Sequence, residues 1–323
     1  MNESKAVSPP IQLKDWTFHR LALSDKEMYL KYVAETEYPM NYSKSFFDFV
    51  WGRSRVGDLA LWKEIDGMLT IFKYERRKNV LYLPFLPLGK GSPEHVIQVL
   101  IKALTFCSAW NGKKAMVRVL NNMQLDYLRS SPLYRKYFRS ITLVGREIYV
   151  SVQHLVHLTG TPFASIRKTI NRFMREYPNA VIRKAVKGDE ERLWALKQIW
   201  NQTAGAKYPK ILDDEYYRRI INRFDELNHI VLLIEVDSKV IAMISGAINP
   251  DGLGWANLLK YDNSYKGVST VMYIELANEI HRLNPESELI NLGSDIGVGD
   301  GLSLYKNKLR PVLFTDRLRL FLK

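Results

Sequence analysis

The order of predicted elements occurs twice along the chain, and this doubling constrains the fold more than any other feature of the sequence. Apolar residues at three- and four-residue spacing indicate helices, and short runs rich in β-branched and aromatic residues between turn signals indicate strands. In the first half, two helices precede three strands, a glycine-containing turn, a long helix and a further strand. The predicted elements are helices at Ser24–Thr36, Ser43–Trp51 and Pro93–Trp110, and strands at Asp58–Glu64, Met68–Tyr74, Val80–Leu83, Ala115–Val119 and Glu147–Val152.

The second half repeats this order after a helix predicted at Thr161–Tyr177. Its predicted helices are Asp189–Gln202, Asp213–Phe224, Val268–Leu283 and Leu302–Asn307, and its predicted strands are Val181–Ala185, Ile230–Val236, Val240–Ile248, Trp255–Tyr261, Leu289–Leu292 and Val312–Phe314. Two helices, an antiparallel meander, a turn facing a phosphate, a helix and a strand make up the GNAT acyltransferase unit. We therefore predict an α/β protein of two GNAT-like units, residues 11–159 and 160–323, each a mixed and largely antiparallel sheet flanked by helices.

The chain is strongly basic. Its 47 Lys and Arg residues outnumber 34 Asp and Glu residues, which gives a formal net charge of +13. One basic stretch contains Arg129, Arg135, Lys136, Arg139 and Arg146. A basic surface attracts the phosphates of RNA, lipid headgroups or nucleotides. We expect Arg135, Lys136 and Arg139 to bind tRNA or another anionic surface, the alternative being an ordinary solvated face.

Several classes of protein are disfavoured by the sequence. Cys107 is the only cysteine, so an internal disulfide or a cysteine-based metal site is not expected. His154 and His157 are close in sequence but lack carboxylate or cysteine neighbours, and we expect neither a metal nor another cofactor. The longest apolar stretch, residues 230–248, is interrupted by charged side chains, and residues 1–10 lack the apolar core of a signal peptide. These features predict a cytoplasmic location, including a peripheral one at the inner face of the membrane.

Six segments together resemble a known family. They are Tyr149–Gly160, Ile166–Phe173, Asn257–Lys260, Tyr265–Ser269, Ile290–Gly297 and Lys306–Pro311. From about residue 12 to 320, the chain is similar to the C-terminal catalytic domain of the phosphatidylglycerol lysyltransferases. These are aminoacyl-tRNA-dependent tandem GNAT enzymes, related in fold to the Fem peptidyltransferases. The chain departs from the family pattern at Lys168, Leu259 and Ser303, which bears on amino-acid specificity more than on fold.

The resemblance implies an aminoacyltransferase whose donor is aminoacyl-tRNA and whose acceptor is a lipid headgroup, a peptide or a small molecule. Asp295, Lys306 and Asn291 are the catalytic candidates: Asp295 to hold the α-ammonium group or accept a proton, Lys306 to neutralise charge, and Asn291 to add a hydrogen bond. The candidates for binding substrate or phosphate are Arg310, Lys260, Arg167, Asn171, Lys266 and Gly267. Asp295 could instead be a turn residue, Lys306 a surface lysine and Arg310 half of an ion pair.

Two other functions remain open at this point. One is an acyl-CoA-dependent N-acyltransferase, which would cradle the pyrophosphate on backbone N–H groups where a helix begins. The matching turn, Tyr265–Ser269, has one glycine, whereas Gly89-Lys90-Gly91 in the first half is richer in glycine. The other is a non-catalytic protein that binds RNA or anionic lipid.

Overall fold

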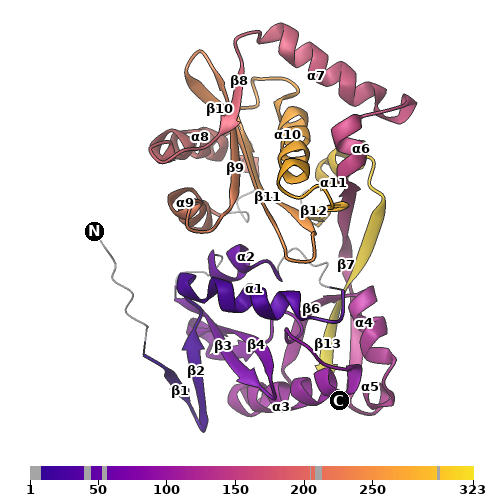
Figure 1. Ribbon diagram of the computed structural model, residues 1–323. Coiled ribbons are helices and arrows are strands. Elements are labelled where there is room, and N and C mark those ends of the chain that lie inside the picture. Colours follow the sequence, from indigo (N-terminus) through magenta and orange to yellow (C-terminus); the bar gives the residue numbers. More distant parts are fainter. Residues whose placement is uncertain (1–8, 40–44, 53–56, 204, 208–212, 297–298) are drawn as a thin grey trace. The chain divides into compact units, whose positions relative to one another are not determined.

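The computed structural model describes residues 9–39, 45–52, 57–203, 205–207, 213–296 and 299–323 (Figure 1). The chain divides into two compact units. The first comprises residues 1–145 and 315–323, and the second comprises residues 146–314.

The first unit is built on an antiparallel five-stranded sheet. In spatial order its strands are β1 (Ile11–Leu13), β2 (Trp16–Arg20), β3 (Asp58–Ile65), β4 (Met68–Glu75) and β5 (Val80–Tyr82). Ile65 pairs with Met68, so Asp66 and Gly67 form a two-residue hairpin loop. Both loop residues have positive φ, 48° and 77°, which Asp-Gly tolerates in this type of turn. The predicted hairpin is confirmed.

The helices of the first unit begin and end at recognisable signals. They are α1 (Lys26–Ala34), α2 (Phe47–Gly52), α3 (Pro93–Asn111), α4 (Asn122–Arg129) and α5 (Pro132–Tyr137). The side chain of Ser92 accepts a hydrogen bond from the backbone of His95 at the start of α3, and Gly112 ends the helix in the left-handed conformation. Cys107 lies inside α3, where burial raises the pKa of its thiol.

The second unit is a mixed sheet between helices. Its strands are the end of β7 (Phe138–Ser151), β12 (Leu289–Ser294), β11 (Gly254–Tyr261), β10 (Lys239–Ile248), β9 (Ile230–Val236) and β8 (Val181–Lys184). Neighbouring strands are antiparallel except β11 and β12. The helices α8 (Glu190–Gln202) and α9 (Asp214–Arg223) lie on one face, and α10 (Val268–Leu283) lies on the other (Figure 1). The remaining helices are α6 (Val152–His157), α7 (Ala164–Glu176) and α11 (Gly299–Lys308).

Two long strands extend beyond their predicted bounds. β7 begins at Phe138, nine residues before the predicted strand. The apolar residues of its first part, Phe138, Ile141, Leu143 and Val144, do not keep the two-residue spacing by which a strand is predicted. β13 (Leu313–Leu322) replaces the short strand predicted at 312–314 and pairs with β6 (Met116–Asn121). The C-terminal residues therefore belong to the first unit, and the boundary lies at Gly145 and Arg146 rather than at residues 159 and 160.

The core of the second unit is apolar on the α10 side of the sheet. Ile234, Ile244, Leu276 and Ile280 are fully buried there, and Phe173 of α7 joins them. In the part of the chain described, no helix is long and apolar enough to cross a bilayer.

Candidate active site

The central strands of the second unit separate partway along their length. β11 and β12 pair only at Gly254 with Ile290 and at Trp255 with Asn291. β10 continues to pair with β11 as far as Tyr261, with a bulge where Asn257 is skipped between Ala256 and Leu258. Residues 256–261 of β11 therefore make no ladder pair with β12, and the two strands diverge. Such a divergence leaves backbone groups available to a bound molecule.

A second bulge shapes the end of β12. Asn291 pairs with Tyr149 and Ser294 pairs with Glu147, so β12 has one more residue than β7 between these pairs. Gly293 takes up the irregularity with a φ of 72°, a conformation that glycine adopts without strain. The bulge places the carbonyl oxygens of Leu292 and Ser294 around one side chain from α11.

That side chain is Lys306. It is only 4% exposed, and its Nζ donates hydrogen bonds to the Leu292 oxygen at 2.7 Å and the Ser294 oxygen at 2.8 Å. Burial lowers the pKa of Lys306 to about 8, and the charges of Glu147 and Asp295 act in the opposite direction. An ammonium group has three N–H donors, so these two bonds leave a third.

Two polar residues beside Lys306 are fixed by the same strands. Asn291 is buried, and its Nδ2 donates to Oε2 of Glu147 at 2.7 Å while its Oδ1 accepts from the backbone of Gly293 at 2.6 Å. Oδ1 of Asp295 accepts from the backbone N–H of Arg146 at 2.6 Å. The three catalytic candidates Asn291, Asp295 and Lys306 are thus brought together within one unit.

Glu147 belongs to this group, although the sequence did not single it out. Glu147 is a buried residue of β7 that accepts the hydrogen bond from Asn291. It is close enough to Lys306 for its charge to raise the pKa of that lysine. The available signal was a single carboxylate opening the apolar run Ile148-Tyr149-Val150. Buried carboxylates without a stabilising partner are costly, so such a residue in a strand is informative.

Lys260 lies elsewhere, in the interior beside α8 and α9. Its Nζ is 2.8 Å from Oδ2 of Asp213 and 3.7 Å from the centre of the Trp200 ring. Burial lowers the pKa of Lys260, and the Asp213 charge opposes this effect. The fully buried Lys197 reaches Oδ1 of Asp213 at 3.0 Å and Oδ1 of Asp214 at 2.7 Å. A phosphate could reach Lys260 only if this buried network separated.

Lys266 and Gly267 lie where α10 begins. Lys266 is exposed, and Gly267 has a φ of 86°. A Cβ atom at Gly267 would lie 2.9 Å from Cγ2 of Thr169, so α7 packs directly over this turn.

The remaining candidates lie on α7 and near its start. Arg167 donates to the carbonyl of Leu158, the residue that caps the end of α6, and to that of Gly160 in the turn that follows. Asn171 is exposed on α7. Arg310 is exposed with a φ of 57°, and its Nε donates to the carbonyl of Pro162 at 2.9 Å. Both arginines therefore hold backbone of the second unit.

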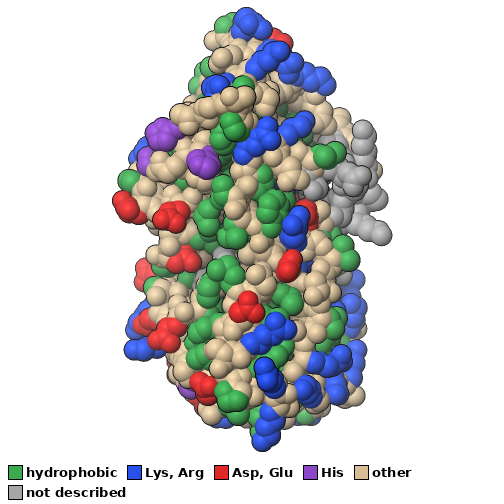
Figure 2. Space-filling view, turned by 90° about the vertical axis from the view of Figure 1, so that its right-hand side faces the viewer, with side chains coloured by type: hydrophobic (Ala, Val, Ile, Leu, Met, Phe, Trp, Pro, Cys, Tyr) green, Lys and Arg blue, Asp and Glu red, His purple; other side chains and the backbone are tan. Residues whose placement is uncertain are grey.

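The predicted anionic-surface residues belong to the first unit. Arg135 and Lys136 lie on α5 and Arg139 lies on β7, and all three are exposed. Figure 2 views the side that carries α5, β7 and β13, and it shows Lys and Arg side chains gathered there with hydrophobic side chains between them.

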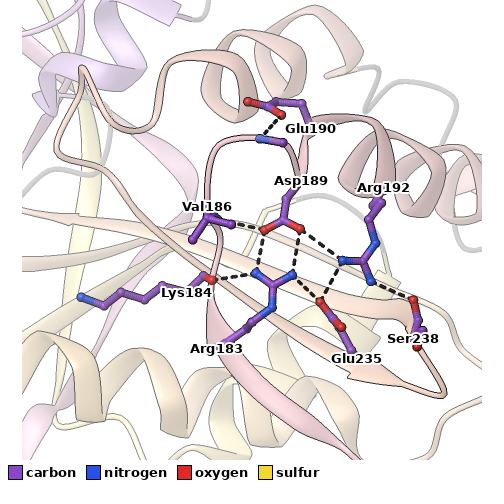
Figure 3. Close-up of polar contacts among 9 residues, drawn as sticks. Arg183, Lys184, Val186, Asp189, Glu190, Arg192, Glu235 and Ser238 are labelled. Atoms are coloured by element: carbon purple, nitrogen blue, oxygen red, sulfur yellow. Dashed lines mark hydrogen bonds and ion pairs between the residues drawn. The ribbon is translucent and has the colours of Figure 1, made fainter.

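A separate ionic cluster fastens β8 to α8 and β9 (Figure 3). Arg183 donates to both oxygens of Asp189, at 2.6 and 2.8 Å, and also to Glu235. Arg192 bridges Glu235 and the Ser238 carbonyl at 3.0 and 2.8 Å. Arg183 is the main cause that lowers the pKa of Asp189 to about 2. Because these charges bind one another, the cluster holds the unit together rather than presenting a site.

No metal centre is formed by the part of the chain that the structure describes. Within it, no three His, Cys, Asp or Glu side chains are placed to share an ion. The polar groups at the end of β12 are a carboxamide, two carboxylates and an ammonium group, a set suited to binding charged substrates and moving protons.

The sequence of the chain matches the model of a known protein family. The model of the family described as "Phosphatidylglycerol lysyltransferase, C-terminal" matches residues 54–294. No curated protein sequence matches the chain. The family match confirms the resemblance drawn from the sequence motifs.

Solved structures share the fold at low sequence identity. A conserved protein of unknown function from Bacteroides thetaiotaomicron superimposes with a TM-score of 0.81 at 19% identity, covering 95% of this chain and 99% of that one. L-PGS from Bacillus licheniformis gives 0.60 at 13% identity, covering 92% and 91%. The structure described as FemX gives 0.62 at 8% identity, covering 94% and 96%. A GNAT-family acetyltransferase is also among the matches, in agreement with the predicted GNAT-like α/β fold.

Proposed function

Because the chain belongs to the phosphatidylglycerol lysyltransferase C-terminal family and is thus an acyltransferase, we propose that it transfers an aminoacyl group from aminoacyl-tRNA at the Lys306 site. The acceptor is a hydroxyl or amine of a lipid headgroup, peptide or small molecule. The enzyme works in the cytoplasm, peripheral to the inner face of the membrane. The observation that carries the proposal is the buried Lys306 ammonium group at the diverging end of β12, within the electrostatic range of Glu147 and Asp295.

The chemistry needs positioning more than activation, because the aminoacyl ester is already reactive. The acceptor oxygen or nitrogen attacks the ester carbonyl carbon, a new C–O or C–N bond forms, and the bond to the ribose oxygen breaks. A proton leaves the acceptor and another reaches the departing ribose oxygen, so the reaction is balanced. Negative charge develops on the carbonyl oxygen in between, and preorganised donors stabilise it.

Lys306 and Asp295 have complementary roles in this proposal. The third N–H of Lys306 stabilises the developing oxyanion or an acceptor-end phosphate. Asp295 binds the α-ammonium group of the aminoacyl moiety or takes the proton of the acceptor. Glu147 and Asn291 keep the end of β12 in position through their 2.7 Å hydrogen bond.

The packing at Gly267 argues against an acyl-CoA donor. GNAT enzymes that use CoA bind its pyrophosphate on free N–H groups where the corresponding helix begins. Here Thr169 lies so close to Gly267 that a single added carbon would be only 2.9 Å away. A pyrophosphate at this turn would compete for space with the Thr169 side chain of α7.

One experiment tests the proposal against both alternatives. Purified protein is incubated with a pool of radiolabelled aminoacyl-tRNAs and extracted membrane lipids, and the label is followed from tRNA into product. We expect one amino acid to leave its tRNA, and we expect saturating acetyl-CoA not to raise the melting temperature, since a bound ligand stabilises the folded state. Stabilisation by acetyl-CoA without tRNA-dependent transfer would favour the N-acyltransferase. Binding of tRNA that transfers no label would favour a non-catalytic binding protein.

A further inference from the structure

Nearly all buried charges of the second unit are paired with one another. Among its described residues, four carboxylates and three lysines are buried: Glu147, Asp189, Asp213, Glu279, Lys197, Lys260 and Lys306. A charge inside a protein destabilises the fold unless a partner of opposite sign or a hydrogen-bonding group accompanies it. The partners of these groups therefore show which charges remain for a substrate.

Three of the buried carboxylates are neutralised by basic side chains of the protein. Asp189 binds two arginines (Figure 3). Glu279 lies 2.5 Å from Nζ of Lys184 and 2.8 Å from the guanidinium of Arg282. Asp213 lies 3.0 and 2.8 Å from the Nζ atoms of the two lysines that are buried beside α8 and α9. These charges are matched within the fold and are not available to a bound molecule.

The charges of the Lys306 site are not matched in this way. Within the described part of the chain Lys306 forms no ion pair, and its two hydrogen bonds are to backbone carbonyls. Asp295 likewise forms no ion pair with a described side chain, and its Oδ1 accepts from a backbone N–H. The fourth buried carboxylate, Glu147, is already bound to the Asn291 amide at 2.7 Å. The site therefore offers a substrate one cation and one carboxylate.

Aminoacyl transfer uses both of these charges. In the proposed function, Asp295 binds the α-ammonium group or takes the acceptor proton, and Lys306 stabilises the developing oxyanion or a phosphate. A charge on the side chain of the amino acid would be an additional one, and no described side chain of the site is left to pair with it. An uncharged side chain needs no such partner.

The unpaired stretch of β11 leads to the same conclusion. Residues 256–261 lie where β11 and β12 diverge, and none of them is Asp or Glu. Leu259 is partly buried against the apolar core on the α10 side, and Lys260 is directed to Asp213 on the opposite face. A cationic side chain would meet aliphatic carbon and another cation there, whereas an uncharged side chain would bury apolar surface.

We propose that the donor ester carries an uncharged amino-acid side chain and that this side chain lies along residues 256–261 of β11. The inference rests on the proposed function and specifies its donor: lysyl, arginyl, aspartyl and glutamyl esters are poor substrates. The reason is a match of charges, because the site has one of each sign and the reaction needs one of each sign.

The first test identifies the amino acid. The full chain is incubated with tRNA charged with each standard amino acid in turn, together with an acceptor pool of extracted lipids, peptides and small molecules. Loss of label from the tRNA is measured against an enzyme-free control. We expect every amino acid that is transferred efficiently to be uncharged. Transfer of a cationic or anionic amino acid at a comparable rate would overturn the proposal.

A second measurement removes the effects of tRNA identity and side-chain size. One tRNA body is charged with lysine or with norleucine, which has a methyl group in place of the terminal ammonium. If the site takes a small side chain, 2,4-diaminobutyrate and norvaline form the corresponding pair. The kcat/KM of the uncharged member should be higher by roughly 100-fold or more, as expected when a charge is buried without a partner. A difference of less than about threefold would contradict the proposal.

A variant tests the position of the side chain. Leu259→Glu introduces a carboxylate into the unpaired stretch of β11, and the residue is only partly buried, so folding should persist. The preference for norleucine over lysine should fall at least about tenfold. The control is Val181→Glu, which adds the same charge at a 52% exposed position of β8 and should leave the preference unchanged. Equal preferences in the two variants would show that the side chain does not lie along β11.

These outcomes can be told apart from a failure of the proposed function. If no amino acid leaves its tRNA faster than in the enzyme-free control, the proposed aminoacyl transfer is itself refuted. If lysine is transferred as efficiently as norleucine, aminoacyl transfer stands and the uncharged donor alone is refuted.

Discussion

Nζ of Lys306 lies 2.7 Å from the carbonyl oxygen of Leu292, at the bulge that ends β12. The bulge and the lysine depend on each other, because the turned carbonyls of Leu292 and Ser294 satisfy an ammonium group that is otherwise buried. Backbone carbonyls solvate the cation without cancelling its charge, and the charges of Glu147 and Asp295 act to raise the pKa of Lys306. Its remaining N–H donor can bind one further acceptor.

The first prediction concerns this cation. Lys306→Ala should lower turnover roughly 10²–10³-fold, as expected when a preorganised oxyanion donor is lost. Lys308→Ala, which removes an exposed lysine from the same helix, should change turnover little. Steady-state transfer of label from aminoacyl-tRNA measures both. Equal activity in the two variants would show that Lys306 has a structural role only.

The second prediction concerns alkaline pH. The pKa of Lys306 falls from 10.5 to about 8 on folding. Turnover should therefore decline above about pH 8 as the cation is lost, and Lys306→Arg should keep its residual activity there because guanidinium remains protonated. Uncatalysed ester hydrolysis is subtracted with an enzyme-free control. A wild-type rate that is constant up to pH 9.5 would contradict this reading.

The same shift has a consequence for stability. Between pH 8 and 10.5 the unfolded chain binds more protons at this lysine than the folded chain does. The free energy of unfolding therefore increases with pH across that range. The gain approaches about 3 kcal/mol at the alkaline end. Urea unfolding of wild type and Lys306→Met at several pH values isolates the effect, since methionine cannot titrate. Parallel curves for the two proteins would refute it.

Local chemistry made much of the fold predictable. The Asp66-Gly67 hairpin and the limits of α3 follow from residues that lie within the turn or the helix caps. β13 could not be delimited in this way, because it pairs with β6 about 200 residues earlier and no local signal reports such a partner. The first part of β7 has the same difficulty, since its apolar residues do not keep the two-residue spacing of a strand with one buried face.

The site residues likewise differ in whether nearby sequence or distant pairing determines their position. Asn291, Asp295 and Lys306 lie close together in one motif-rich segment and could be grouped from the sequence. Glu147 could not, because the register that sets it against Asn291 joins residues 144 positions apart. For Lys260 the residue type suggested a phosphate contact, whereas its burial beside Asp213 depends on how α8 and α9 pack on the sheet.

The third prediction concerns that buried network. Asp213→Ala would leave Lys197 and Lys260 without their shared carboxylate and should destabilise the protein by about 3–5 kcal/mol. Asp214→Ala should have a much smaller effect, about 1 kcal/mol or less, because its side chain is 42% exposed and Lys197 keeps Asp213. Denaturant unfolding compares the two. Similar losses would mean that Asp213 is not the centre of the network.

The fourth prediction concerns Asp295. In Asp295→Asn the remaining Oδ1 can still accept the hydrogen bond from the Arg146 backbone, so the melting temperature should change little. Loss of the negative charge should reduce transfer, through weaker binding of the α-ammonium group if KM rises, or through slower proton transfer if kcat falls. Unchanged kinetic constants would exclude Asp295 from both roles.

The last prediction tests whether the β12 bulge itself is needed. Gly293 has a φ of 72°, and an added Cβ would lie 4.0 Å from Nζ of Lys306, so Gly293→Ala fits the space but strains the backbone. The strain should cost about 1–2 kcal/mol of stability. Gly112→Ala is the matched control: its φ is 64°, no atom lies within 4 Å of the added carbon, and it ends α3 in the first unit.

Both variants should lose similar stability in denaturant unfolding. Only Gly293→Ala should also lose transfer activity, because relaxing its backbone moves the Leu292 and Ser294 carbonyls away from Lys306. Equal activity in the two variants would show that the bulge can relax without disturbing the lysine, and the coupling between them would then be refuted.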